Sequence, residues 1–94
     1  MPSPITGGRR SKFEIVGEIL KVCDPDAVNK TTIMYRSNLS YDQLRRYLTV
    51  LSDQELIYKN EQGRFGITRR GQKTLKQVSS VVKTLRFPVK TNQK

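Results

Sequence analysis

The stretch SYDQLRRYLTVLS, residues 40–52, decides the fold of this chain. Ser40 and Gln43 make the S-x-x-Q pattern of a capping box, in which each side chain satisfies the free backbone amide of the other residue at a helix start. Leucines then recur at spacings of four and three residues, which aligns them on one helix face: Leu44, Leu48 and Leu51. The pattern predicts a helix over about 41–52 that packs through this leucine stripe.

The opposite face of this helix is polar and basic. It carries Asp42, Gln43, Arg45, Arg46 and Thr49. In the DNA major groove, arginine can reach guanine edges or phosphates, glutamine can pair with adenine, and a small threonine permits close approach. Two adjacent arginines on a solvent face also occur for solubility alone, so the surrounding topology decides between the two interpretations.

Two further helices are predicted before this one. Ser11 and Glu14 form a second capping box, S-x-x-E, and apolar residues at helical spacing predict a helix over about 12–23. Pro25 breaks that helix, residues 27–30 can add a few strand-like pairings, and Thr31 starts a short helix over about 32–37. Cys23 is interpreted as a small core residue.

A hairpin and a last helix follow the leucine-striped helix. The segments LIYKN (56–60) and RFGI (64–67) flank a short turn. Within the first segment, Leu56 and Tyr58 are expected on one face and Ile57 and Lys59 on the other. Thr68 caps the last helix, about 69–87, which Pro88 ends. The expected fold class is mainly α with a small β-hairpin, a winged helix-turn-helix with a C-terminal dimerisation helix.

The last helix has an apolar seam that steps by three, four and three residues: Leu75, Val78, Val82 and Leu85. This is the a/d spacing of a coiled coil. So short a seam, in a segment rich in valine and serine, does not hold a helix by itself and needs a partner. The seam either lies back on its own domain or pairs with the same helix of a second copy, and the dimer is the favoured interpretation.

Positive charge is concentrated at both ends of the chain. The net charge is +10, from 18 basic and 8 acidic residues, and all eight acids lie within residues 13–61. We divide the chain into a flexible basic arm (1–10), a winged helix-turn-helix domain (11–67), a C-terminal helix with the dimer seam (68–87) and a basic tail (88–94). A near-neutral globule with basic extensions is typical of a nucleic-acid-binding protein.

Further candidate contacts to DNA lie outside the leucine-striped helix. They are Arg36 at the end of the second helix, Lys59 and Arg64 beside the hairpin turn, Arg9 and Arg10 in the arm, and Arg69 and Lys73 in the last helix. Basic arms can enter an adjacent minor groove. Lys76 continues the spacing of Arg69 and Lys73, so these three cations share one helix side, which suits phosphates. The alternative interpretation of each residue is a solvated surface position.

Several function classes are disfavoured by composition. Histidine is absent and Cys23 is the single cysteine, so a zinc finger lacks its ligands and a Ser-His or Cys-His nucleophile lacks its base. The acids form no catalytic pair and no glycine-rich phosphate loop is present, so we expect no enzyme, no cofactor and no metal. The sequence has no apolar run that could span a bilayer, and we expect a cytoplasmic, nucleoid-associated protein without membrane or small-molecule partners.

Several short motifs carry a family resemblance. They are R-S-K-x-E-I (from Arg10 to Ile15), I-M-Y, N-L-S-Y, Q-L, Y-L and I-T-x-x-G (from Ile67 to Gly71). Over about residues 10–80 the chain resembles the small archaeal winged-helix DNA-binding proteins of the ten-kilodalton chromatin type. The resemblance implies a homodimer, joined through an antiparallel pair of C-terminal helices, that binds duplex DNA with limited sequence preference or regulates transcription. The turn before the hairpin reads D-Q-E-L, where relatives often place glycine.

The expected function is therefore that of a dimeric double-stranded DNA-binding protein, either a transcriptional regulator or a chromatin-associated architectural protein. The helix over 41–52 would read the major groove, with phosphate contacts from the arm, the hairpin and the last helix. Two alternatives stay open: a winged-helix protein-interaction adaptor without direct DNA reading, and an RNA-binding protein. The deep, narrow major groove of A-form RNA suits such a helix less well than the B-form groove.

Overall fold

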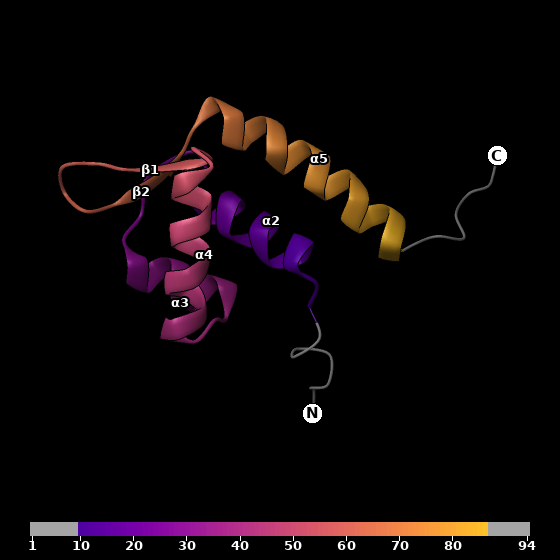
Figure 1. The fold of residues 1–94 in the computed structure, drawn as a ribbon, viewed down its shortest axis with the longest axis horizontal. Helices are drawn as coiled ribbons and strands as arrows, with labels where there is room; N and C mark the ends of the chain where they lie inside the picture. Colours follow the sequence, from indigo (N-terminus) through magenta and orange to yellow (C-terminus); the bar gives the residue numbers. More distant parts are fainter. Residues whose placement is uncertain (1–9, 87–94) are drawn as a thin grey trace.

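Residues 10–86, whose backbone the computed structural model describes, form four helices and a two-stranded antiparallel hairpin (Figure 1). Side chains are described for residues 10–81. The elements in chain order are α2 (Lys12–Val22), α3 (Lys30–Ser37), α4 (Tyr41–Asp53), β1 (Ile57–Lys59), β2 (Phe65–Ile67) and α5 (Arg69–Arg86). The predicted fold class, mainly α with a small hairpin, is confirmed. Most of the predicted arm and the whole basic tail lie outside the described residues.

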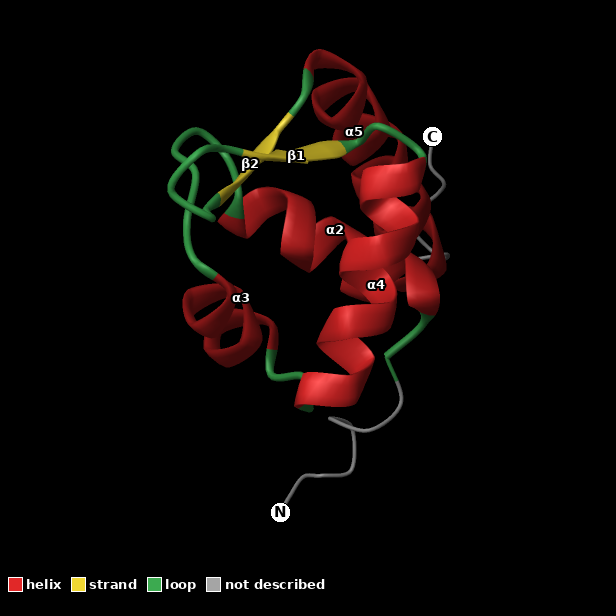
Figure 2. Ribbon diagram, turned by 60° about the vertical axis from the view of Figure 1, so that its left-hand side comes forward, coloured by secondary structure: helices red, strands yellow, loops and turns green. Residues whose placement is uncertain are grey.

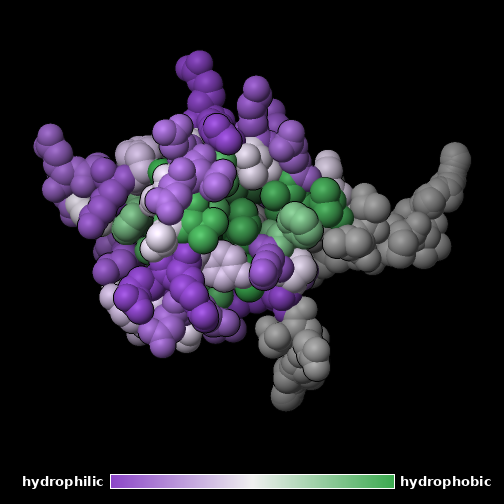
Figure 3. All heavy atoms as spheres, in the orientation of Figure 1, coloured by the Kyte–Doolittle hydropathy of each residue, from purple (hydrophilic) through white to green (hydrophobic). Residues whose placement is uncertain are grey.

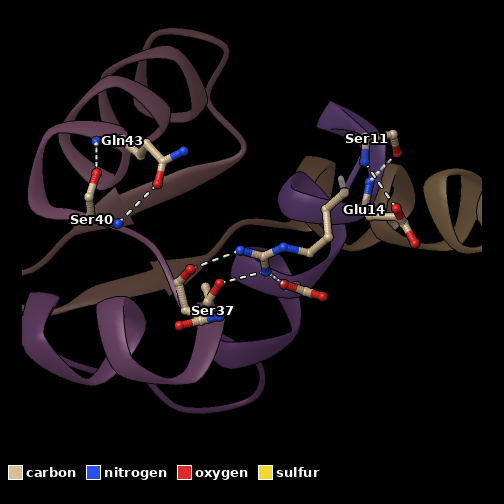
Figure 4. A network of polar contacts seen from close by, with 8 residues as sticks. Ser11, Glu14, Ser37, Ser40 and Gln43 are labelled. Atoms are coloured by element: carbon tan, nitrogen blue, oxygen red, sulfur yellow. Dashed lines mark hydrogen bonds and ion pairs between the residues drawn. The ribbon is translucent and has the colours of Figure 1, made fainter. Parts of the chain in front are cut away.

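Both predicted capping boxes are present (Figure 4). The Ser11 hydroxyl accepts from the Glu14 amide at 3.1 Å, and the Glu14 carboxylate accepts from the Ser11 amide at 3.0 Å. Ser40 and Gln43 repeat this exchange at the start of α4, at 3.2 and 3.0 Å. Because each pair satisfies two amides that a helix start leaves free, α2 and α4 begin where the sequence predicts.

The start of α3 corrects the prediction by two residues. The helix begins at Lys30, and its cap is Asn29, whose side-chain oxygen accepts from the Thr32 amide at 2.9 Å, so Thr31 is not the cap. The residue before the cap, Val28, makes a two-way backbone bridge with Phe65 of β2, at 2.9 and 2.7 Å. The predicted strand-like pairing is thus confirmed at Val28, and it holds the chain extended up to the cap.

The hairpin is closed by side-chain and backbone hydrogen bonds at its tip. The Asn60 side-chain oxygen accepts from the amides of Gln62 and Arg64, each at 2.9 Å, and Gly63 takes a left-handed φ of 79°. The expected alternation of faces is wrong at its first residue, since Leu56 and Ile57 are both buried. Leu56 precedes β1 and follows Glu55, whose φ of 60° turns the chain, and within β1 only Ile57 is buried.

The hairpin is joined to α5 through a tight contact at Gly71. Thr68 caps α5 as predicted, because its hydroxyl accepts from the Gly71 amide at 2.9 Å. The Thr68 amide donates to the Leu56 carbonyl at 3.0 Å. A Cβ atom on Gly71 would lie 2.1 Å from that same carbonyl oxygen. The glycine of the I-T-x-x-G motif is therefore required by the close approach of α5 to the segment before β1.

The core is built around α2. Its fully buried residues Ile19 and Leu20, with Cys23 directly after its end, belong to a core cluster that includes Ile33 of α3 and the leucine stripe of α4. Figure 2 shows α4 in front with α2 passing behind it. Cys23 is a core residue, as predicted, and burial raises the pKa of its thiol to about 11.

The helix α5 packs along α2, more extensively than any other pair of elements in the described part of the chain (Figure 1). A Cβ atom on Gly17 would come within 3.3 Å of a Val78 methyl, so the glycine lets the two helices approach closely. Val78 is 8% exposed and Leu75 is partly buried against the core. The first half of the predicted seam therefore packs on its own domain. The side chains of Val82 and Leu85 lie outside the described residues.

Candidate nucleic-acid interface

The outward side of α4 presents every polar residue expected there. Asp42, Gln43, Arg45, Arg46 and Thr49 are all exposed. Neither guanidinium makes an ion pair with an acid among residues 10–81. Two adjacent cations thus face outward from the middle of a capped helix, without an acid to neutralise them.

Two of these side chains are constrained by bonds to their own helix. The Gln43 side-chain oxygen is occupied by the Ser40 amide, which leaves its amide nitrogen to donate outward. The Thr49 hydroxyl donates to the Arg45 carbonyl at 3.0 Å. A bidentate pairing of Gln43 with adenine would have to share the oxygen that caps the helix.

The turn between α3 and α4 is held in place by a left-handed residue and a buried leucine. Asn38 takes the left-handed conformation, with φ 52° and ψ 53°, and ends α3. Leu39 is buried and anchors the turn in the core. Arg36 is exposed in the last turn of α3, and Tyr35 beside it is 76% exposed, although the sequence left packing open for that tyrosine.

Arg10 takes a different place from the one expected for an arm residue. Its guanidinium pairs with the Glu18 carboxylate of α2 and donates to the carbonyls of Ser37, at 2.6 Å, and Asn38, at 2.9 Å (Figure 4). Charge-assisted bonds of this kind are among the stronger ones in proteins. The structure therefore uses Arg10 to tie the start of the described chain to the α3–α4 turn. Arg9 lies outside the described residues.

A cation–aromatic contact joins the starts of α3 and α4. The Lys30 ammonium lies 5.5 Å from the centre of the Tyr41 ring, which is itself half exposed. This pair could not be predicted from the sequence, because the rest of α3 and the following turn separate the two residues. It adds a fixed cation near the first turn of α4.

The hairpin places its two predicted cations differently. Lys59 lies opposite Phe65 in the strand register, and its ammonium is 5.8 Å from that ring centre. Arg64 is exposed just beyond the turn. In Figure 1 the hairpin projects to the left, α4 lies below its base, and α5 begins above its base and runs away to the right. The wing is therefore a separate basic projection beside α4.

The predicted cations of α5 line one open groove. It has a volume of about 420 Å³ and lies between the α2–α3 turn and the first part of α5, and its lining residues are Asp24, Arg69, Gln72, Lys73, Leu75 and Lys76. The common side expected for Arg69, Lys73 and Lys76 is thus observed. The groove does not include any residue of α4, so the structure separates the α5 cations from the outward side of α4.

One exposed residue of α4 was missed by the sequence interpretation. Val50 is 55% exposed, next to Thr49 and one turn after Arg46. The sequence analysis did not assign this residue, although the helical period places it outside the leucine stripe. No helix within residues 10–86 has the length and hydropathy needed to cross a membrane.

Comparison with known proteins agrees with this geometry. Residues 9–86 match the sequence profile of the winged helix-turn-helix family. An uncharacterized protein of Methanocaldococcus jannaschii is 32% identical over 83 residues, which cover 88% of this chain and 39% of the relative. A second one from the same organism is 35% identical over 65 residues, covering 69% of this chain and 66% of the relative. The chain therefore spans less than two thirds of either relative.

Solved structures show the same arrangement of elements. The crystal structure of Sso10a-2, a DNA-binding protein from Sulfolobus solfataricus, superposes with a TM-score of 0.75 at 25% identity, covering 82% of this chain and 83% of that one. A MarR family transcriptional regulator from Silicibacter pomeroyi shares the fold, with a TM-score of 0.63 at 14% identity over 89% of this chain and 61% of its own. The profile spans most of the chain and the sequence relatives are archaeal, so this chain belongs to the winged helix-turn-helix family, in its group of small archaeal members.

Proposed function

We propose that this chain is a dimeric double-stranded DNA-binding protein that acts as a transcriptional regulator or a chromatin-associated architectural protein. The observation that carries the proposal is the pair Arg45 and Arg46, which face outward from α4 without an acid partner among the described residues. The similarity to Sso10a-2, a DNA-binding protein, supports it. A helix about 10–12 Å wide fits the B-form major groove, which is about 12 Å wide.

The outward side of α4 offers groups for both base and phosphate contacts. Arg45 and Arg46 can reach guanine edges or phosphates, and the free amide nitrogen of Gln43 can donate to an acceptor. Asp42 can accept from the amino group of cytosine. The exposed hairpin cations Lys59 and Arg64 and the exposed Arg36 of α3 suit contacts to the DNA backbone, and we assign Arg9 the same electrostatic role.

The groove of α5 suits phosphates beyond the contact made by α4. Arg69, Lys73 and Lys76 face one acid, Asp24, so the groove keeps an excess of positive charge. Such charge increases affinity for any duplex and does not distinguish sequences. We therefore propose that α4 recognises DNA and that the wing and α5 supply much of the attraction.

Binding to a mixed-sequence duplex, measured by fluorescence anisotropy from 50 to 200 mM salt, tests the proposal. We expect binding at low salt that weakens steeply, with a log–log slope of about −0.9 for each neutralised phosphate. Duplex RNA should compete poorly, because the A-form major groove does not admit a helix. Absence of binding at low salt would instead favour a protein-interaction adaptor.

The dimer is proposed from the apolar surface where α2 and α5 run side by side (Figure 3). Phe13 of α2 is 53% exposed and Val81 of α5 is 41% exposed. The apolar spacing of α5 continues past them in the sequence, through Val82 and Leu85. A second copy of the same helix would cover this surface with a matching apolar seam.

We expect sedimentation equilibrium to give twice the chain mass of 10.8 kDa. Leu85→Asp should shift the mass to that of one chain, because a buried carboxylate without a partner is strongly unfavourable. Gln72→Asp adds the same charge at an exposed position of the same helix, on the side opposite Val81, and should leave the dimer intact. A wild-type protein of 10.8 kDa would contradict the dimer.

A further inference from the structure

Val50 is an exposed aliphatic residue that folding does not explain. Its side chain is on the outward side of α4, whereas the helix packs through Leu44, Leu48 and Leu51, each at most 6% exposed. Valine is a poor helix former, because its branched side chain loses rotamer freedom against the preceding turn. An exposed valine therefore gains neither burial nor helix stability at this position.

Thr49 exposes a methyl group beside a hydroxyl that is already hydrogen-bonded within the helix. Its hydroxyl is turned back to the Arg45 carbonyl at 3.0 Å, so that bond already satisfies the polar half of the side chain. The methyl group occupies another staggered position on the same Cβ atom and is left for an external contact. Thr49 is exposed, so that contact is not made by the core.

Arg46 borders both residues. It precedes Thr49 by three positions and Val50 by four, so these two residues lie on either side of it on the helix surface. Its guanidinium has no acid partner among residues 10–81. The outward side of α4 therefore combines one free cation with an apolar group on each side of it. We call these two groups the methyl patch: the Thr49 methyl and the Val50 side chain.

We propose that the methyl patch contacts the 5-methyl groups of thymines, so that the protein prefers major grooves rich in A·T pairs. The thymine methyl is the apolar group on the major-groove edge, and the other base edges present donors and acceptors. Arg46 would hold the adjacent phosphate or guanine while the methyl patch packs on thymine. This inference rests on the proposed DNA binding and names the base class that α4 selects.

The test compares two duplexes of one mixed sequence, with half of the pairs A·T, that differ only in having thymine or deoxyuridine. Deoxyuridine lacks the 5-methyl group and keeps the same pairing. We expect the wild-type protein to bind the uracil duplex about three- to tenfold more weakly, since each buried methyl-sized group contributes roughly fourfold. Val50→Ala and Thr49→Ser should each lower this ratio, and the double variant should bring it close to one.

Thr49→Ser is the matched variant, because it keeps the hydroxyl that bonds Arg45 and removes only the methyl. Thr31→Ser removes the same methyl group from an exposed threonine of α3 and should leave the ratio unchanged. Equal and tight binding of both duplexes by the wild-type protein overturns the inference and leaves DNA binding standing. An unchanged ratio in the double variant also overturns it. Binding to neither duplex, nor to a third one made only of G·C pairs, overturns the proposed function itself.

Discussion

Replacing Arg46 by alanine is expected to weaken binding to duplex DNA by about 5- to 150-fold, the range for losing one good arginine contact. Arg46 faces outward from the middle of α4 and makes no ion pair in the described part of the chain, so its charge is available to DNA. Anisotropy titrations across salt measure the effect. If the contact is to a phosphate, the salt slope should fall by about one as well.

Two further variants identify the kind of contact that Arg46 makes. Arg46→Lys keeps the charge but loses the planar fork that pairs with guanine, so a phosphate contact would survive it and a guanine contact would not. Lys12→Ala removes one positive charge from the exposed start of α2, outside α4, and should change affinity less than about threefold, as expected for a screened surface charge. If Lys12→Ala and Arg46→Ala had equal effects, net charge alone would explain binding, and α4 would not be the reading helix.

Gly71→Ala is expected to lower the melting temperature by about 10–20 °C, from an overpacking cost of roughly 2–3 kcal/mol in a domain of this size. The added Cβ atom would lie 2.1 Å from the Leu56 carbonyl oxygen. That oxygen accepts from the Thr68 amide, and Thr68 in turn caps α5. Relief of the clash would have to move backbone atoms and would break this hydrogen bond. The substitution should therefore lower the free energy of unfolding. Thermal unfolding followed by far-ultraviolet circular dichroism provides the measurement.

Gly66→Ala is the matched control for that clash. Its Cβ atom would lie 2.5 Å from the Tyr58 ring, but the ring belongs to a half-exposed side chain that can swing away. We expect a fall of less than about 5 °C for this variant, corresponding to roughly 1 kcal/mol or less. Equal losses at the two glycines would show that the backbone contact of Gly71 is not what makes it essential.

The helix starts could be predicted because their causes are local. Each capping box needs only residues three positions apart, and Ser11 with Glu14 and Ser40 with Gln43 satisfy each other wherever the chain goes next. The start of α3 could not be predicted in the same way. Asn29 and Thr31 are both able to cap, and the choice depends on the bridge of Val28 with Phe65, which is distant in sequence.

The conformation of the turn before the hairpin could not be predicted from local sequence patterns either. Glu55 takes a positive φ of 60°, and the sequence alone does not indicate that glutamate adopts this conformation. The burial of both Leu56 and Ile57 follows from that turn. Local patterns located the hairpin, whereas its first residue depends on how the turn packs.

The candidate site was predictable where the helical period determines it. The leucine stripe fixes which side of α4 faces inward, and the polar residues opposite it are exposed as expected. Arg10 was not predictable, because its partners Ser37 and Asn38 lie 27 and 28 positions away. Val50 could have been placed from the sequence, because the helical period alone puts it outside the leucine stripe.

The single cysteine is a natural probe of the opening of this core. Cys23 is fully buried in the cluster around α2, and burial raises the pKa of its thiol to about 11, so at neutral pH it is an uncharged, shielded group. Alkylating reagents attack the thiolate, and they reach it only in molecules whose core has opened. The rate of mass gain with such a reagent therefore reports the opening equilibrium of the unaltered chain, with no engineered label and no second thiol to confuse it.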